Sequence, residues 1–243
     1  MDAPREHAVR RVLLKLSGEA LSGEGSFGVD QAVTEGICEQ IAAVINRHVQ
    51  LAIVIGGGNF FRGINAANTN MDKVTADYIG MLATVMNALA LQSGLRAMHV
   101  NAKIQSAIPI STIVDSYNRD RALEYLKNGY AVIFAAGTGN PFFTTDTAAS
   151  LRAVEMGVDL MLKATKVNGI YSDDPMKNYN AKKYDQISYD EVLEKRLAIM
   201  DATAIALCRE HNLPLRVFSI TEPGMLMRVI SGGEEGTLVS NEA

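Results

Sequence analysis

Four segments of this chain carry the residue types that bind phosphate groups. They are residues 15–28, 56–63, 137–146 and 163–174, and each follows a short apolar run typical of a β-strand. Glycine lets backbone N–H groups approach a ligand closely, and a nearby lysine or arginine supplies positive charge. Because ligands of open α/β sheets bind at the carboxyl ends of the strands, these segments predict a phosphate-binding edge.

Residues 56–58 are three consecutive glycines, and Arg62 follows them with a planar fork suited to phosphate oxygens. The segment is neither a dinucleotide-binding fingerprint nor a P-loop. Phe61 stands where the fingerprint needs glycine, and Ile64 stands where the P-loop needs lysine. The alternative interpretation is a tight glycine turn beside a solvated arginine.

Lys15 lies inside an apolar strand pattern, next to Ser17 and Gly18. A buried lysine is costly without an anion, so Lys15 is a candidate for contacting a transferring phosphate. An outward-facing lysine on an edge strand is the alternative. In the fourth segment, Asn168 and Gly169 favour a type I′ hairpin. That hairpin is the alternative to a nucleotide-binding role.

Residues 137–146 form the most specific segment, with two glycines, a proline, two phenylalanines, three threonines and an aspartate at a strand-to-helix junction. Thr144 or Thr145 can cap the next helix, whose N-terminus attracts an anion. Phe142 and Phe143 can pack against a nucleotide base or stabilise the turn. Asp146 does not suit an anion, so we expect it to orient a cation or a lysine.

The elements that must position these segments alternate along the chain. Strand-like runs lie at 12–16, 51–55, 96–100, 131–135, 159–163 and 215–219, and helical patterns lie near 30–49, 71–93, 119–127, 145–155, 189–195, 202–210 and 224–230. The alternation predicts an α/β fold whose mainly parallel sheet is covered on both faces. We expect one domain over residues 1–243, with a flexible segment at 1–10 and a hairpin and surface loop at 167–185.

The amino-acid composition excludes several classes of protein. The 243 residues include 23 Lys and Arg against 27 Asp and Glu, a net charge of −4, which disfavours a nucleic-acid binder that relies on bulk positive charge. Two cysteines, Cys38 and Cys208, cannot build a disulfide framework, and no secretory signal pattern is present, so we expect a cytoplasmic protein. The charge-free stretch 78–95 predicts a helix buried on most sides rather than a membrane span, and such a helix often packs against a second subunit.

Taken together, six sequence segments resemble those of a known protein family. LLKLSGEAL at 13–21, VIGGGNFFRG at 54–63, IGMLATVMNALA at 79–90, AGTGNPFFTTD at 136–146, LKATKVNGIYSDDP at 162–175 and MDATA at 200–204 resemble the bacterial uridylate (UMP) kinases of the amino acid kinase superfamily. The resemblance covers residues 11–240. It implies a three-layer αβα sandwich and the reaction of ATP with UMP to give ADP and UDP, with Mg²⁺ bound alongside ATP. It also implies a homohexamer in pyrimidine nucleotide biosynthesis.

The resemblance also implies site residues. For catalysis they are Lys15, Arg62 and Asp146. For ATP binding they are Lys15, Leu16, Ser17, Gly18, Gly58, Arg62, Thr165, Tyr171 and Asp174. For UMP binding they are Gly57, Asp77, Thr138, Gly139, Asn140, Pro141, Phe142, Phe143, Thr144 and Thr145. For activation by GTP they are Gly23, Glu24, Gly25, Ser26, Phe27, Gly28, Arg96 and Lys103, and UTP is expected to inhibit from the UMP site.

In this scheme Lys15 and Arg62 neutralise charge on the transferred group, and Asp146 orients rather than acts as a base, because the phosphate of UMP is already a nucleophile. Asp77 accepts hydrogen bonds from the ribose. Two alternatives stay open. One is another kinase of the superfamily, acting on an acylated amino acid or carbamate. The other is a sensor that binds uridine nucleotides without turnover.

Overall fold

A central sheet organises the computed structural model, which describes residues 9–23, 25, 27–61, 71–173, 175 and 177–242. In this part of the chain the sheet has nine strands in the order β4-β3-β5-β2-β1-β6-β10-β11-β9. The strands are β1 (Arg11–Leu16), β2 (Gln50–Ile55), β3 (Ala102–Ser106), β4 (Asp115–Ser116), β5 (Ala131–Ala135), β6 (Leu160–Thr165), β9 (Gln186–Ser188), β10 (Leu215–Ser219) and β11 (Thr237–Ser240). Among these pairs, β10 and β11 run antiparallel and the others run parallel.

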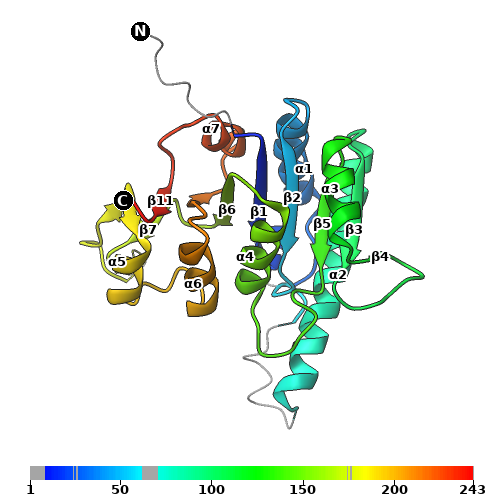
Figure 1. Ribbon diagram of the computed structural model, residues 1–243, viewed down its shortest axis with the longest axis horizontal. Helices are drawn as coiled ribbons and strands as arrows, with labels where there is room; N and C mark the ends of the chain where they lie inside the picture. The colour runs from blue at the N-terminus through cyan, green and yellow to red at the C-terminus, as the bar shows by residue number, and fades with distance from the viewer. Residues whose placement is uncertain are drawn as a thin grey trace.

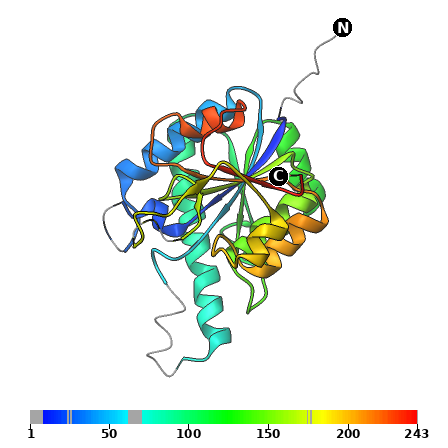
Figure 2. The same cartoon turned by 90° about the vertical axis from the view of Figure 1, so that its left-hand side faces the viewer.

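Helices cover both faces of the sheet (Figures 1 and 2). One face carries α1 (Gln31–Ile45), α2 (Lys73–Ala97) and α7 (Met225–Ile230), and the other carries α3 (Arg119–Lys127), α4 (Thr145–Met156), α5 (Tyr189–Glu194) and α6 (Ala202–Glu210). A 3₁₀ helix, η1 (Gly18–Leu21), follows β1. The three-layer α/β fold expected from the sequence is therefore confirmed.

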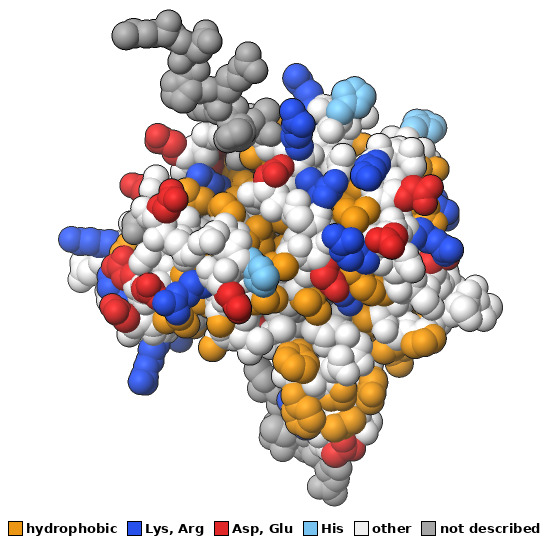
Figure 3. Space-filling view, in the orientation of Figure 1, with side chains coloured by type: hydrophobic (Ala, Val, Ile, Leu, Met, Phe, Trp, Pro, Cys, Tyr) orange, Lys and Arg blue, Asp and Glu red, His pale blue; other side chains and the backbone are white. Residues whose placement is uncertain are grey.

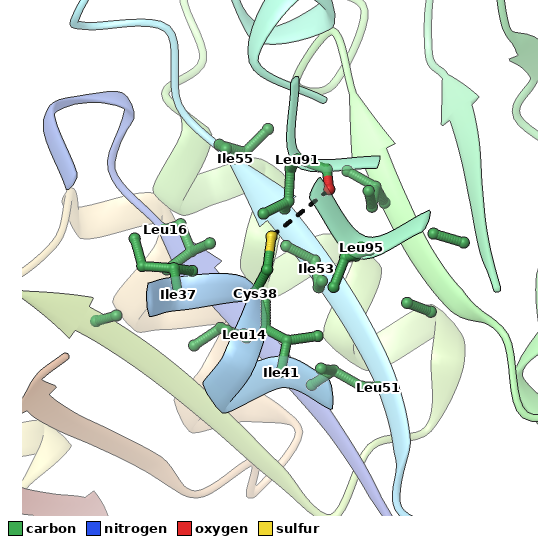
Figure 4. Packing of buried hydrophobic residues seen from close by; sticks show 14 of the residues in the cluster. Leu14, Leu16, Ile37, Cys38, Ile41, Leu51, Ile53, Ile55, Leu91 and Leu95 are labelled. Carbon is green, nitrogen blue, oxygen red and sulfur yellow. Dashed lines mark hydrogen bonds between the residues drawn. The ribbon is translucent and has the colours of Figure 1, made fainter. Parts of the chain in front are cut away.

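The central strands are apolar along their whole length because both of their faces are buried. Figure 4 shows one of the two core layers, where Cys38 of α1 lies among Leu14, Ile41 and Leu91. Its thiol lies 3.8 Å from the carbonyl oxygen of Leu91, and burial raises the pKa of Cys38 to about 12. Cys208 is buried in the other layer. Both thiols therefore behave as apolar core groups.

Two local predictions were wrong. Residues 96–100 are not a strand, because α2 continues to Ala97 and β3 begins only at Ala102. Leu91 and Leu95 keep the helical period on the buried side, and the apolar run resembled a strand only when taken alone. Asn168 and Gly169 do not form a type I′ hairpin.

Gly169 instead leads into β7 (Ile170–Tyr171), which pairs antiparallel with β8 (Lys183–Tyr184). A hairpin therefore does lie within residues 167–185, as expected, but its turn is the long connection between these two strands. The sequence patterns also missed the short strands β4, β9 and β11. Strands of two to four residues carry too few alternating positions to stand out from loops.

Helix α2 is less buried than the sequence predicted. Nine of its residues are buried against the body of the protein, but Tyr78, Leu82, Met86 and Leu89 are exposed by 43%, 49%, 50% and 36%. Among the described helices α2 is long and apolar enough to cross a membrane by length and composition alone, with 44% of that window buried. Figure 2 shows α2 extending beyond the body, and hydrophobic side chains gather on that end in Figure 3. The expectation of burial on most sides is wrong for the single chain.

Candidate active site

Three charged side chains meet at the carboxyl end of the central strands. Lys15 of β1 lies directly opposite Lys163 of β6 in the parallel register, so both side chains leave the same face of the sheet. Asp146, in the first turn of α4, sits between them, with its Oδ1 2.9 Å from the Lys15 Nζ and its Oδ2 2.8 Å from the Lys163 Nζ. Because β1 pairs with β2 and β6, the edge-strand alternative for Lys15 is excluded.

The cluster is electrostatically unbalanced, with two ammonium groups for one carboxylate. Burial alone would raise the pKa of Asp146, but the ammonium groups of Lys15 and Lys163 hold it below its usual value. Burial lowers the pKa of Lys163, an effect that Asp146 opposes and Lys15 reinforces. A net positive charge in a mostly buried position is suited to receive the oxygens of a phosphate.

The sequence analysis did not assign Lys163 a site role. Its signal was present, because Lys163, like Lys15, interrupts an apolar strand pattern near its end. What the sequence could not show is the register that sets the two lysines side by side.

The two glycine loops pack directly on each other beside this cluster. A Cβ on Gly18 would lie 2.7 Å from the backbone nitrogen of Gly58, and a Cβ on Gly57 would lie 2.8 Å from the carbonyl oxygen of Gly80 in α2. Neither contact leaves room for a side chain. Glycine is therefore required here by the close approach of backbones, and the tight-turn alternative understates the role of these residues.

A buried amide pair fixes the same loop. The side-chain nitrogen of Asn59 donates to the Asn87 oxygen at 2.9 Å, and the Asn87 nitrogen donates back at 2.6 Å. Asn87 also donates to the carbonyl oxygen of Gly56, and Asn59 to that of Gly28. Since every partner is satisfied, the pair holds the glycine loop rigidly to α2.

The N-terminus of α4 is held by a second residue that the sequence analysis did not assign. Thr144 caps α4 by accepting from the backbone nitrogens of Asp146 and Thr147. Its own hydroxyl donates to Asp201, which also accepts from Thr147 and caps α6 through Ala204. Asp201 stands within MDATA before a helix, which is a capping pattern readable from the sequence.

A small cavity of about 130 Å³ opens beside the glycine loop. Its lining includes Gly57, Asp77, Thr138, Phe143, Thr144 and Thr145 of the expected UMP set. Thr138 and Phe143 come from the loop between β5 and α4. The remaining members of the set, Gly139, Asn140, Pro141 and Phe142, belong to that loop but do not line the cavity. Asp77 accepts from the backbone nitrogen of Phe142 at 2.8 Å and pairs with Lys73.

A larger cavity of about 600 Å³ is lined by Lys163 of the cluster, by Thr165 and Tyr171, and by residues 195–199. Thr165 and Tyr171 belong to the expected ATP set, whereas the 195–199 segment was not expected. Lys15, Leu16, Ser17, Gly18 and Gly58 lie toward the charged cluster and the glycine loops rather than on this lining. Arg62 and Asp174 lie outside the described residues.

Within the described part of the single chain, the residues expected to bind GTP lie in two separate places. Arg96 and Lys103 line a polar cavity of about 180 Å³ between the end of α2 and β3. Gly28 instead bonds to Asn59 of the glycine loop, and the Phe27 ring packs edge-on against Phe60 at 5.6 Å. Gly23 and Gly25 lie in the same loop as Gly28, whereas Glu24 and Ser26 lie outside the described residues.

The described residues fit a magnesium ion that arrives on a nucleotide. Mg²⁺ prefers oxygen ligands and is commonly shared between one or two carboxylates and substrate phosphates. Both oxygens of Asp146 face lysines, and no group of three or more metal-ligating side chains occurs in the described part of the chain. Asp146 is thus the carboxylate of this cluster, and its oxygens are engaged by Lys15 and Lys163.

The lowered pKa of Lys163 predicts a pH effect. On the ATP-binding role that the resemblance implies for this segment, kcat/KM for ATP should decrease as the pH rises, and the decrease should begin below the ordinary lysine pKa of 10.5, because proton loss removes a positive charge that would face phosphate. Lys163→Arg keeps its charge at all accessible pH values and should move this alkaline fall upward. Lys166→Arg, at an exposed neighbouring lysine, is the matched control. An identical alkaline limb in Lys163→Arg and the unmodified protein would contradict the assignment.

On the UMP-binding role that the resemblance implies for Asp77, Asp77→Asn is expected to raise KM for UMP about tenfold, because charge-assisted hydrogen bonds contribute more than neutral ones. Asparagine loses the charge that holds the Phe142 backbone and faces the cavity. The kcat and KM for ATP should change about twofold or less. Lys73→Met breaks only an exposed ion pair and should leave KM for UMP nearly unchanged. Equal rises in both KM values would contradict a role specific to UMP.

Fold and site together define an α/β phosphotransferase, with a buried lysine–aspartate–lysine cluster between two cavities at the carboxyl edge of a parallel sheet. Residues 10–219 match the model of the amino acid kinase family, and the chain belongs to that family.

Solved structures agree with this assignment. The UMP kinase from Bacillus anthracis is 38% identical with a TM-score of 0.94, and the match covers 97% of each chain. The UMP kinase from Ureaplasma parvum is 36% identical with a TM-score of 0.90, covering 96% of this chain and 99% of that one. The uridylate kinase from Archaeoglobus fulgidus is 26% identical with a TM-score of 0.73, covering 94% and 99%.

Proposed function

We propose that this protein transfers the γ-phosphoryl group of ATP to UMP, giving ADP and UDP. The observation that carries the proposal is the position of the Lys15–Asp146–Lys163 cluster. Lys163 lines the larger cavity, and Thr144 and Thr145, the neighbours of Asp146, line the smaller one. A donor nucleotide and an acceptor phosphate in these two cavities would therefore meet at the lysines. The likeness to two UMP kinases along nearly the whole chain supports the same substrates.

In the proposed reaction a phosphate oxygen of UMP attacks the γ-phosphorus of ATP, and the bond to the oxygen bridging the β- and γ-phosphorus breaks. The chain acts by positioning and by charge. Lys15 and Lys163 neutralise the transferring oxygens, and Asp146 holds both ammonium groups in place. We include Arg62 as a further cation on sequence grounds. Mg²⁺ bound to ATP would supply additional neutralisation of the phosphate oxygens.

The test is a coupled assay of ADP release with ATP, Mg²⁺ and a panel of UMP, CMP, dUMP, AMP and N-acetylglutamate. We expect rapid turnover with UMP. Activity on N-acetylglutamate without activity on UMP would instead assign the chain to the kinases of acylated amino acids. Binding of UMP in calorimetry without turnover would assign it to a nucleotide sensor. Repeating the assay with added GTP and UTP tests the two expected effectors.

We further propose a cytoplasmic homo-oligomer, a hexamer by resemblance, that serves pyrimidine nucleotide biosynthesis. The exposed apolar residues of α2 support self-association, because Tyr78, Leu82, Met86 and Leu89 recur at helical spacing on one side. Light scattering measures the mass directly. Leu82→Glu with Met86→Glu should reduce it, whereas an unchanged mass would place the subunit contact elsewhere.

A further inference from the structure

We propose that Thr84 is a positioning residue for the acceptor loop, defined as residues 136–144 between β5 and α4. The inference rests on the proposed function only in naming UMP as the acceptor. The hydroxyl of Thr84 fixes the backbone at the point where this loop leaves the sheet. It thereby sets the affinity for UMP and leaves the affinity for ATP nearly unchanged.

The hydrogen bonds of Thr84 are fully committed to backbone groups. Thr84 lies in α2 and is 2% exposed. Its Oγ1 accepts from the backbone nitrogen of Ala136 at 2.7 Å, and its hydroxyl proton goes to the carbonyl oxygen of Met81 at 2.7 Å. With its one proton used, Thr84 cannot donate to a substrate. Thr84 also contributes to the lining of the smaller cavity, and its hydroxyl acts on the acceptor loop through Ala136.

The backbone at Ala136 needs such a partner. Ala136 is fully buried with φ of +62°, and Gly137 follows with φ of +58°. A left-handed conformation is unfavourable for a residue that has a Cβ, so the surroundings must hold it. The pairing of β5 with β3 ends at Ala135, which leaves the Ala136 N–H without a ladder partner. Thr84 supplies that partner inside the core.

The same helix also holds the far part of the acceptor loop. Asp77 lies two helical turns before Thr84 and accepts from the backbone nitrogen of Phe142. The loop is thus fastened to one side of α2 at Ala136 and again at Phe142. Between these points Gly137 and Thr138 line the smaller cavity. Loss of the Thr84 bond would release the loop at its start, next to the cavity wall.

The experiment compares Thr84→Val, which keeps the shape but removes the acceptor, with Thr84→Ser, which keeps the hydroxyl. Thr84→Val should raise KM for UMP about tenfold or more and KM for ATP about twofold or less. Thr84→Ser should restore both values. Thr34→Val is the matched control, because Thr34 is a buried helical threonine that bonds only to the Asp30 carbonyl, away from the acceptor loop. Should Thr84→Val not fold, Thr84→Cys replaces the hydroxyl with a weak acceptor.

Hydrogen exchange at the Ala136 amide separates this inference from the proposed function. Exchange there should be faster in Thr84→Val than in Thr84→Ser, whatever the substrate. Wild-type protein that turns over no UMP would overturn the proposed function while the exchange result still decides the role of Thr84. Unchanged exchange at Ala136, or equal rises of both KM values with a lowered melting temperature, would overturn the positioning role.

Discussion

Replacing Asp146 by asparagine is expected to lower kcat by roughly a hundredfold or more, the scale seen when a preorganised charge contact is lost from an active site. Asparagine keeps the shape of the side chain but removes the charge that Lys15 and Lys163 both face. The two ammonium groups then face each other with only the smaller effect of Asp201 on Lys163 to offset their repulsion. The pKa of Lys163, already lowered by burial, should fall further because the Asp146 charge no longer opposes that effect.

The substitution should also destabilise the fold, by about 3–5 kcal/mol if neither lysine loses its proton. In the unmodified protein, the contribution of Asp146 to stability is complete above the ordinary carboxyl pKa and is lost only as the pH falls through its lowered pKa. Steady-state kinetics and thermal melting at neutral pH measure both effects. Asp159→Asn is the control, because Asp159 accepts only from the Arg10 and Arg11 backbone at the far end of β1. A kcat within about threefold of the unmodified value would contradict the role of Asp146.

Lys15→Met is expected to separate activity from stability. The kcat should fall about a hundredfold, because an ammonium beside the transferring phosphoryl is lost. The melting temperature should stay unchanged or rise. Methionine fills a similar volume, and Asp146 remains paired with Lys163, so the cluster becomes neutral.

Kinetics of Lys15→Met are measured against Lys127→Met, at an exposed lysine in the last turn of α3. A large loss of melting temperature would show that Lys15 serves the fold instead. Full turnover in Lys15→Met would remove it from the catalytic scheme.

The sequence predicted the convergence of the four polar segments well, because parallel strands bring their carboxyl ends to one edge. It could not predict contacts that depend on register and helix rotation. The pairing of Lys163 with Asp146 depends on the register of β1 against β6. The hydrogen bond from the Ala136 backbone nitrogen to Thr84 depends on the rotation of α2 about its own axis. The end of α2 was missed because no glycine or proline marks it, and His99 makes the turn with φ of +60° instead.

The lysine–aspartate–lysine cluster holds two positive charges and one negative charge, so its charges do not balance within the cluster. Lys15 and Lys163 share the charge of Asp146, with a smaller contribution from Asp201 at Lys163, so a bound phosphate would add negative charge where two ammonium groups lie close together. Nucleotides, and even inorganic phosphate, should then protect the protein against heat by occupying that position. The same imbalance that prepares the site for phosphoryl transfer keeps the empty protein below its attainable stability.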